Sequence, residues 1–149
     1  MRVDGACHCG NLSFILETRQ ARETITPRAC DCGFCTRHGA QCWSDPEGRV
    51  TIRVRDDVLL QRYRFGQATA DFLVCRRCGV YLGAMIGEDA SARATVNLRL
   101  TALRDVPATS VSYAGESRAE RIARRLARWT PASVEFGSEP APTPGQTPR

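Results

Sequence analysis

The sequence predicts a mainly β domain of short strands, with one amphipathic helix near its C-terminal end. Apolar and polar residues alternate at 12–16 and again at 50–54, which is the period of a strand with one buried face. Turn-forming residues separate such segments, as the Asp-Pro-Glu-Gly stretch at 45–48 does before the second of them. Many short strands with turns between them are typical of a mainly β fold.

The expected strands follow one another along the part of the chain that precedes the helix. The apolar positions of the two clearest strands are Leu12, Phe14, Leu16, Val50, Ile52 and Val54. Further strands are expected at 59–65, 71–74, 80–86 and 94–98, with a polar loop at 87–91. The β structure is therefore expected within roughly the first 115 residues.

The helix is expected near 118–129. Ser117 and Glu120 have the spacing of a capping box, in which each side chain accepts a hydrogen bond from the backbone N–H of the other. The apolar face consists of Ala119, Ile122, Leu126 and Trp129, and the opposite face of Arg121, Arg124, Arg125 and Arg128. Pro131 suits the end of the helix. We expect the apolar face to pack on the domain and the arginines to face solvent.

Length and composition indicate one domain. The chain has 149 residues, of which 42% are hydrophobic and 25% charged, and this is enough to bury one core. No apolar run approaches the roughly 20 residues of a membrane-spanning helix, and the segment 1–5 lacks the apolar region of a signal peptide. We therefore expect a single cytoplasmic domain over 1–136, followed by a disordered Pro-rich tail at 137–149.

The charge of the chain argues against nucleic acid as its main partner. All 21 basic residues are Arg, a bias that a GC-rich genome alone would produce. The net charge of +5 is small for a nucleic-acid-binding protein, and no basic block with interleaved aromatic residues occurs. Nothing in the composition indicates a membrane partner either.

Seven of the eight cysteines fall in three short clusters. A C-x-C pair lies at 7–9, a C-x-C-x-x-C triplet at 30–35 and a C-x-x-C pair at 75–78, while Cys42 stands alone. Thiols stay reduced in the cytoplasm, so such clusters indicate metal binding or catalysis rather than disulfides. A Gly beside closely spaced cysteines permits the tight turn that directs two sulfurs at one ion.

The clustered cysteines divide into four plus three. A structural zinc takes four protein ligands, whereas a catalytic zinc takes three and keeps one position open. The two pairs predict a structural zinc site at Cys7, Cys9, Cys75 and Cys78, and the triplet predicts a second zinc site with an exchangeable fourth position at Cys30, Cys32 and Cys35.

Alternatives for the triplet remain open at this stage. Cys42 could be a fourth ligand, either of a second structural zinc or of an iron–sulfur cluster, or it could be a small buried apolar residue. His38 could be a ligand, a proton shuttle or a donor to a ligand, or an ordinary histidine. His8 lies between two ligands and is expected to point away from the metal.

The three clusters in this order resemble the glutathione-dependent formaldehyde-activating enzyme family, which includes the centromere protein V relatives. The matching segments are Gly-Ala-Cys-His-Cys-Gly at 5–10, Cys-Asp-Cys-Gly-Phe-Cys at 30–35, Phe-Leu-Val-Cys-Arg-Arg-Cys-Gly at 72–79 and Val-Asn-Leu-Arg at 96–99. The resemblance implies a zinc-binding β-tent fold. It also implies the same division of the cysteines, with the four on a structural zinc and the triplet on a catalytic one.

The activity implied by the resemblance is the condensation of formaldehyde with glutathione, formally a carbon–sulfur lyase reaction in reverse. Three thiolates make zinc a weak Lewis acid, but a fourth thiol can still bind as a thiolate that attacks an aldehyde. We therefore expect an enzyme whose partners are a low-molecular-weight thiol and a small aldehyde, or their adduct. The candidate partners for glutathione carboxylates are Arg28, Arg37, Arg76 and Arg77.

Two other functions are compatible with the same motifs. One is a non-catalytic zinc module that contacts nucleic acid or a protein through the Arg-rich helix, which predicts steeply salt-dependent binding to DNA. The other is a redox or zinc sensor at the open triplet, which predicts loss of zinc on mild oxidation and recovery with reductant.

Overall fold

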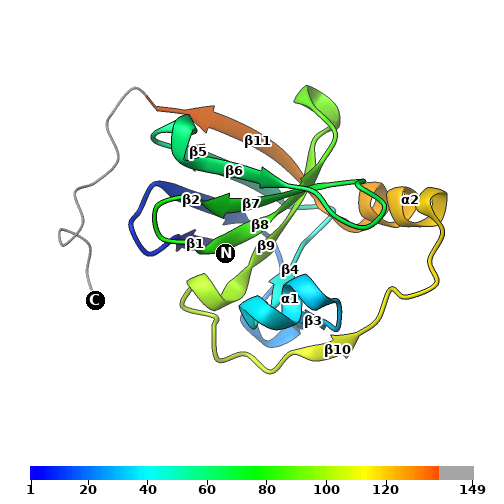
Figure 1. The fold of residues 1–149 in the computed structure, drawn as a ribbon. Helices are drawn as coiled ribbons and strands as arrows, with labels where there is room; N and C mark the ends of the chain where they lie inside the picture. The colour runs from blue at the N-terminus through cyan, green and yellow to red at the C-terminus, as the bar shows by residue number, and fades with distance from the viewer. Residues whose placement is uncertain (138–149) are drawn as a thin grey trace.

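The computed structural model describes residues 1–137, which form a mainly β structure (Figure 1). Its strands are β1 (Arg2–Ala6), β2 (Leu12–Glu17), β3 (Arg28–Cys30), β4 (Cys42–Trp43), β5 (Arg49–Val54), β6 (Leu60–Tyr63), β7 (Asp71–Cys75), β8 (Tyr81–Ile86), β9 (Arg93–Asn97), β10 (Thr109–Val111) and β11 (Thr130–Phe136). The α-helices are α1 (Gly33–His38) and α2 (Arg118–Arg128). Single 3-10 turns lie at Arg22–Thr24, Asp57–Leu59, Asp89–Ser91 and Leu98–Leu100.

The strands form one branched sheet. One path runs in the order β1-β2-β5-β11-β9-β4-β3-β10, and β8, β7 and β6 extend from β9 on its other side. Most neighbours are antiparallel, while β11 pairs with β5 and β10 pairs with β3 in parallel. In Figure 1, β3, α1 and β10 lie together below the larger part of the sheet, and α2 lies at one end of it.

The two clearest predicted strands are confirmed and pair with each other. In β2 and β5, Leu12 lies opposite Val54, Phe14 opposite Ile52 and Leu16 opposite Val50. All six side chains are buried. The apolar side chains of both strands therefore face the same core. The strand predicted at 59–65 is shorter in the structure. A 3-10 turn ends at Leu59, and the strand covers Leu60–Tyr63.

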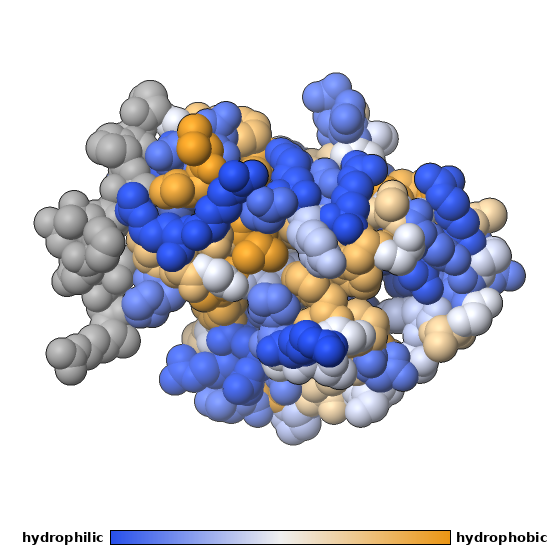
Figure 2. Space-filling model, viewed as in Figure 1, coloured by the Kyte–Doolittle hydropathy of each residue, from blue (hydrophilic) through white to orange (hydrophobic). Residues whose placement is uncertain are grey.

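The core has two parts. The larger one lies among β1, β2, β5, β8 and β9 and contains the apolar side chains of those strands. A smaller one contains Phe72, Tyr81 and Trp129 together with Cys35. The smaller part brings α1, β7, β8 and the end of α2 together, and it forms the wall of the site described below. On the face seen in Figure 2, apolar surface lies in the middle with hydrophilic residues on both sides.

Helix α2 presents different faces from those predicted. The capping box is present, with Glu120 N donating to Ser117 Oγ at 3.1 Å and Ser117 N donating to Glu120 Oε2 at 2.9 Å. However, Arg125 is only 8% exposed while Leu126 is 45% exposed. The prediction that all the arginines face solvent is therefore wrong: Arg125 is turned inward, where it donates to Thr69 Oγ1, and Arg121 and Arg124 pair with Glu116.

The described residues end beside the predicted domain boundary. Gly137, the first residue of the predicted tail, donates a backbone hydrogen bond to Val54 O at 2.8 Å and so follows the pairing of β11 with β5. The rest of the predicted disordered tail, 138–149, lies outside the described residues. Within 1–137, the structure contains no helix that is both long and apolar enough to span a bilayer.

Candidate functional site

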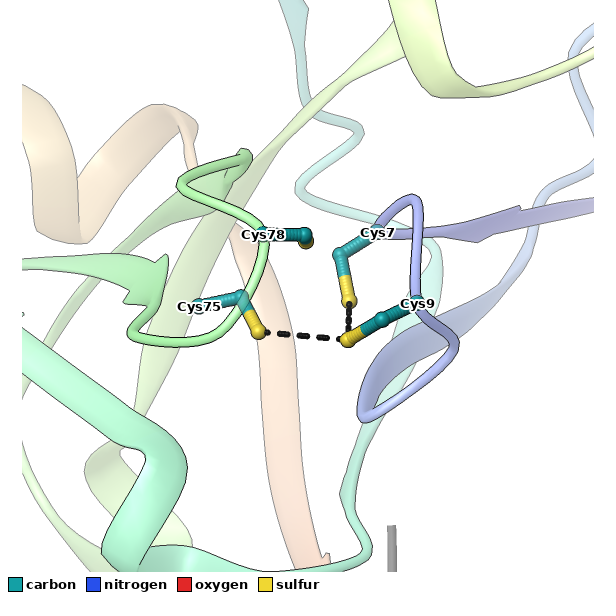
Figure 3. Close-up of side chains that lie close together, drawn as sticks. All are labelled: Cys7, Cys9, Cys75 and Cys78. Atoms are coloured by element: carbon teal, nitrogen blue, oxygen red, sulfur yellow. Dashed lines mark hydrogen bonds between the residues drawn. The ribbon is translucent and has the colours of Figure 1, made fainter. Parts of the chain in front are cut away.

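The first candidate centre is the four-cysteine group, Cys7, Cys9, Cys75 and Cys78. Its residues come from the turn after β1 and from the β7–β8 hairpin, and their sulfurs point toward one another (Figure 3). The Sγ atom of Cys9 lies 3.8 Å from that of Cys7 and 3.5 Å from that of Cys75. In a tetrahedral zinc site the sulfurs would be about 3.8 Å apart, given zinc–sulfur bonds of about 2.3 Å. The group could therefore hold a metal ion.

Local backbone geometry builds this group. Gly10 and Gly79 follow the two cysteine pairs with φ values of 79° and 75°, a conformation that favours glycine. Leu12 N donates to Cys7 Sγ at 3.2 Å. Burial raises the pKa of Cys7. At Cys78 burial acts in the same direction, but hydrogen bonds from backbone N–H groups and from neighbouring thiols together lower the pKa to about 7. A substantial fraction of the Cys78 sulfur is therefore ionised at neutral pH.

The second candidate centre is the three-cysteine group, Cys30, Cys32 and Cys35. Cys30 ends β3, Cys32 caps the N-terminus of α1, and Cys35 lies in its first turn, with Cys35 N donating to Cys32 Sγ at 3.4 Å. The three sulfurs lie within 4.8 Å of one another. A hydrogen bond from the Cys35 thiol lowers the pKa of Cys30 to about 6 against the effect of burial, and the same bond raises the pKa of Cys35. This group could also hold a metal ion.

Cys42 is not part of the three-cysteine group. Its sulfur contacts the Tyr81 hydroxyl at 3.8 Å, and burial raises its pKa to about 11. Cys42 also lines the cavity beside the three cysteines, so its sulfur lies near the group without belonging to it.

The two histidines lie outside both cysteine groups. His38 packs on Phe34 and Tyr81, with ring centroids 4.5 Å and 5.6 Å apart. His8 is exposed, consistent with the expectation that it points away from the metal.

A cavity of about 380 Å³ lies beside the three-cysteine group. Five aromatic side chains form much of its wall, namely Phe65, Phe72, Tyr81, Tyr113 and Trp129. Phe72 contacts both Phe65 and Tyr81, with ring centroids 4.7 Å and 5.7 Å apart. The cysteines therefore open onto a largely apolar space of the size that small ligands occupy.

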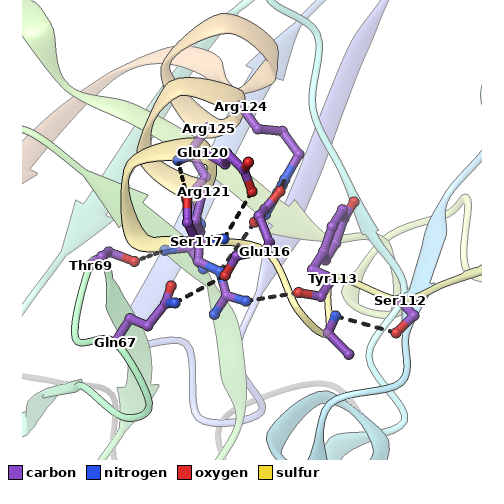
Figure 4. Close-up of polar contacts among 11 residues, drawn as sticks. Gln67, Thr69, Ser112, Tyr113, Glu116, Ser117, Glu120, Arg121, Arg124 and Arg125 are labelled. Atoms are coloured by element: carbon purple, nitrogen blue, oxygen red, sulfur yellow. Dashed lines mark hydrogen bonds and ion pairs between the residues drawn. The ribbon is translucent and has the colours of Figure 1, made fainter.

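Arginines form the polar part of the cavity wall. They are Arg28 from β3 and Arg121, Arg124 and Arg125 from α2. Glu116 accepts hydrogen bonds from Arg121 Nε at 3.1 Å and from Arg124 Nε at 2.8 Å, and the Arg124 guanidinium stacks 3.6 Å from the centre of the Tyr113 ring (Figure 4). The carboxylate of Glu116 and the ring of Tyr113 thus explain why Arg121 and Arg124 turn inward from α2.

The structure changes which arginines are candidates for binding a ligand. Of the four predicted from the sequence, only Arg28 lines the cavity. Arg37 donates to Gly33 O on the surface of α1, and Arg76 and Arg77 lie in the turn of the four-cysteine group. The arginines of α2 were missed because a charged helical face indicates solvent exposure by default.

We expect Glu116→Gln to lower the unfolding free energy at neutral pH by about 2 kcal/mol, since it removes a carboxylate that two guanidiniums share. Arg124, and then Arg121, hold the pKa of Glu116 below its usual value. The stability that the carboxylate contributes is therefore complete above about pH 4.3, the unfolded pKa, and is lost as the pH falls through the lowered folded pKa.

Denaturant unfolding of both proteins at neutral and at acidic pH tests this prediction. The matched control is Glu135→Gln, which breaks an exposed ion pair with Arg53 and should cost less than about 1 kcal/mol. A difference between wild type and Glu116→Gln that stayed constant down to the lowest pH would contradict the assignment.

Comparisons with known proteins give no functional name. No family model matches the chain, and no curated protein matches it. Among solved structures, the chain is similar to a Rhodobacter sphaeroides protein with 32% sequence identity and a TM-score of 0.47. The similarity covers 71% of this chain and 99% of that one, and the description of that protein gives no function.

Proposed function

We propose that this chain is a zinc-dependent enzyme that adds a low-molecular-weight thiol, such as glutathione, to formaldehyde or another small aldehyde, or cleaves the adduct. The observation that carries the proposal is the three-cysteine group, which opens onto a cavity while Cys42 stays outside the group. The resemblance of the three cysteine clusters to the glutathione-dependent formaldehyde-activating enzyme family supports it. On this proposal the four-cysteine group holds a structural zinc.

The chemistry suits the donor set. A zinc ion held by Cys30, Cys32 and Cys35 would supply an open position and lower the pKa of a thiol bound there. In the reaction, the thiolate sulfur forms a bond to the aldehyde carbon, the carbon–oxygen π bond breaks, and the oxygen takes up a proton. The cleavage direction reverses each of these changes.

The chain's own residues would contribute a dry, shaped site. Phe65, Phe72 and Trp129 line the cavity with apolar surface, which disfavours hydration of the aldehyde. Burial raises the pKa of Tyr81, so its hydroxyl remains protonated at neutral pH. Tyr81 lines the cavity, and its hydroxyl, which contacts the Cys42 sulfur at 3.8 Å, would donate a hydrogen bond to the aldehyde oxygen.

An assay of adduct formation tests the proposal. Wild-type protein loaded with zinc should accelerate formation of the adduct from glutathione and isotopically labelled formaldehyde, followed by NMR. Cys32→Ser should lower this rate by at least about 100-fold, because it removes one of the three sulfurs. Arg37→Ala changes an exposed residue of the same helix and should retain the rate. An unchanged rate in Cys32→Ser would exclude the proposed site.

A further inference from the structure

Arg125 is a buried cation in the wall of the cavity. It lies in the last turn of α2, is 8% exposed, and lines the same cavity as the three-cysteine group. Nη1 donates to Thr69 Oγ1 at 2.5 Å (Figure 4). The guanidinium lies 5.0 Å from the centre of the Trp129 ring. Its Nε is buried, and among the residues that the structure describes it has no hydrogen-bond partner.

A guanidinium in this position is unfavourable unless an anion faces it. A buried charge is usually paired, because taking it out of water without a counterion costs several kcal/mol. Thr69 supplies a hydroxyl, which accepts a hydrogen bond but carries no charge. Burial, together with the neighbouring cation Arg124, lowers the pKa of Arg125 to about 10, so the side chain is still charged at neutral pH.

The other charges around the cavity do not neutralise Arg125. Glu116 pairs with Arg121 and Arg124, which leaves those two guanidiniums with a single carboxylate between them. Arg28 donates to the Ser44 hydroxyl at 2.7 Å and, within residues 1–137, forms no ion pair. Asp31 is a further carboxylate in the cavity wall. Four guanidiniums therefore stand against the carboxylates of Asp31 and Glu116, and positive charge is in excess.

We propose that the cavity binds a ligand that carries a carboxylate, and that Arg125 holds this carboxylate while the other end of the ligand reaches the three-cysteine group. The planar guanidinium forms charge-assisted, often bidentate hydrogen bonds with carboxylates, and its buried Nε is the donor that lacks an acceptor. Within residues 1–137 Arg125 has no carboxylate partner, so a ligand carboxylate would be its counterion. Arg125 is on this view a specificity-determining residue.

The identity of the ligand as a thiol or an aldehyde rests on the proposed function, whereas the carboxylate site does not. The carboxylate could belong to either substrate, and two matched pairs of small molecules separate these sources. Mercaptoacetate and mercaptoethanol differ mainly in the carboxylate of the thiol. Glyoxylate and acetaldehyde differ in the carboxylate of the aldehyde.

The experiment measures binding of each compound to the full zinc-loaded chain by calorimetry, beside the rate of adduct formation. We expect the carboxylate-bearing member of one pair to bind at least about tenfold more tightly than its partner. Arg125→Met, which keeps an unbranched side chain as far as the position of Nε and removes the charge, should abolish this preference. Arg125→Lys should keep part of it. Arg128→Met, at an exposed position of the same helix, should keep all of it.

The outcomes separate this inference from the proposed reaction. A preference that is lost in Arg125→Met without adduct formation from any combination would support the carboxylate site and reject the reaction. Adduct formation with no preference in either pair, or a preference that survives Arg125→Met, would overturn the inference alone. If Arg125→Met does not fold, binding of acetate but not acetamide to the wild-type chain gives the same test, and equal binding of both would reject the site.

Discussion

Replacing Cys9 by Ser is expected to remove one metal ion per chain and to lower the unfolding free energy by at least about 4 kcal/mol. The Cys9 sulfur lies between those of Cys7 and Cys75, which are on segments far apart in the sequence. A metal ion bound there joins the turn after β1 to the β7–β8 hairpin. Without it, buried thiols of the group lose their shared partner, and the N-terminal strand loses its main connection to the hairpin.

Denaturant unfolding combined with metal analysis checks this result. Cys42→Ser is the matched control, since Cys42 lies outside the four-cysteine group, and we expect it to leave that group's metal bound. Addition of a strong chelator to the wild-type chain should reproduce the destabilisation of Cys9→Ser. A Cys9→Ser chain that unfolded at the same denaturant concentration as wild type would show that the group does not stabilise the fold.

Gly83→Ala is expected to lower the unfolding free energy by at least about 3 kcal/mol. Gly83 lies in the middle of β8, and a Cβ atom added there would be 2.3 Å from the backbone oxygen of Thr95 and 3.1 Å from the Cα of Val96. Both atoms belong to the neighbouring strand β9, so a rotamer change cannot relieve the clash. The strands must move apart, and Tyr81 and Ala84, which line the cavity, move with β8.

Thermal unfolding measures this effect, with an expected decrease in Tm of roughly 10 °C for a chain of this length. Gly66→Ala is the control, because a Cβ there would meet no atom within 4 Å and only the positive φ of 59° opposes it. That substitution should cost about 1 kcal/mol. A similar decrease in Tm in the two variants would show that close packing of β8 on β9 is not the reason for glycine at position 83.

The parts of the fold that the sequence predicts are those with a local signal. Strands β2 and β5 each carry a full alternation of apolar and polar residues, so both could be located without knowing their partners. Strands β3, β4 and β10 have three residues or fewer, which is too short for a period to appear. Strand β11 was missed because Pro131 indicates the end of a helix, and the chain re-forms a strand immediately after α2.

In the candidate site, too, the sequence predicts the features that depend on neighbouring residues and misses those that depend on distant segments. Spacing alone groups the cysteines of each cluster, because neighbouring residues of a tight turn must share one ion. The separation of Cys42 from the three-cysteine group depends on the position of Tyr81, which lies on a distant strand. The inward direction of Arg125 depends on Thr69 and Trp129, and no pattern within α2 indicates those partners.

The measurement that tests the central claim most directly is the metal content of three proteins, the wild type, Cys32→Ser and Cys42→Ser. The claim is that Cys30, Cys32 and Cys35 hold a metal ion without Cys42, beside the ion of the four-cysteine group. It predicts two ions per chain in the wild type, one in Cys32→Ser and two in Cys42→Ser. A wild-type chain with one ion, or a Cys42→Ser chain that loses one as Cys32→Ser does, would contradict it.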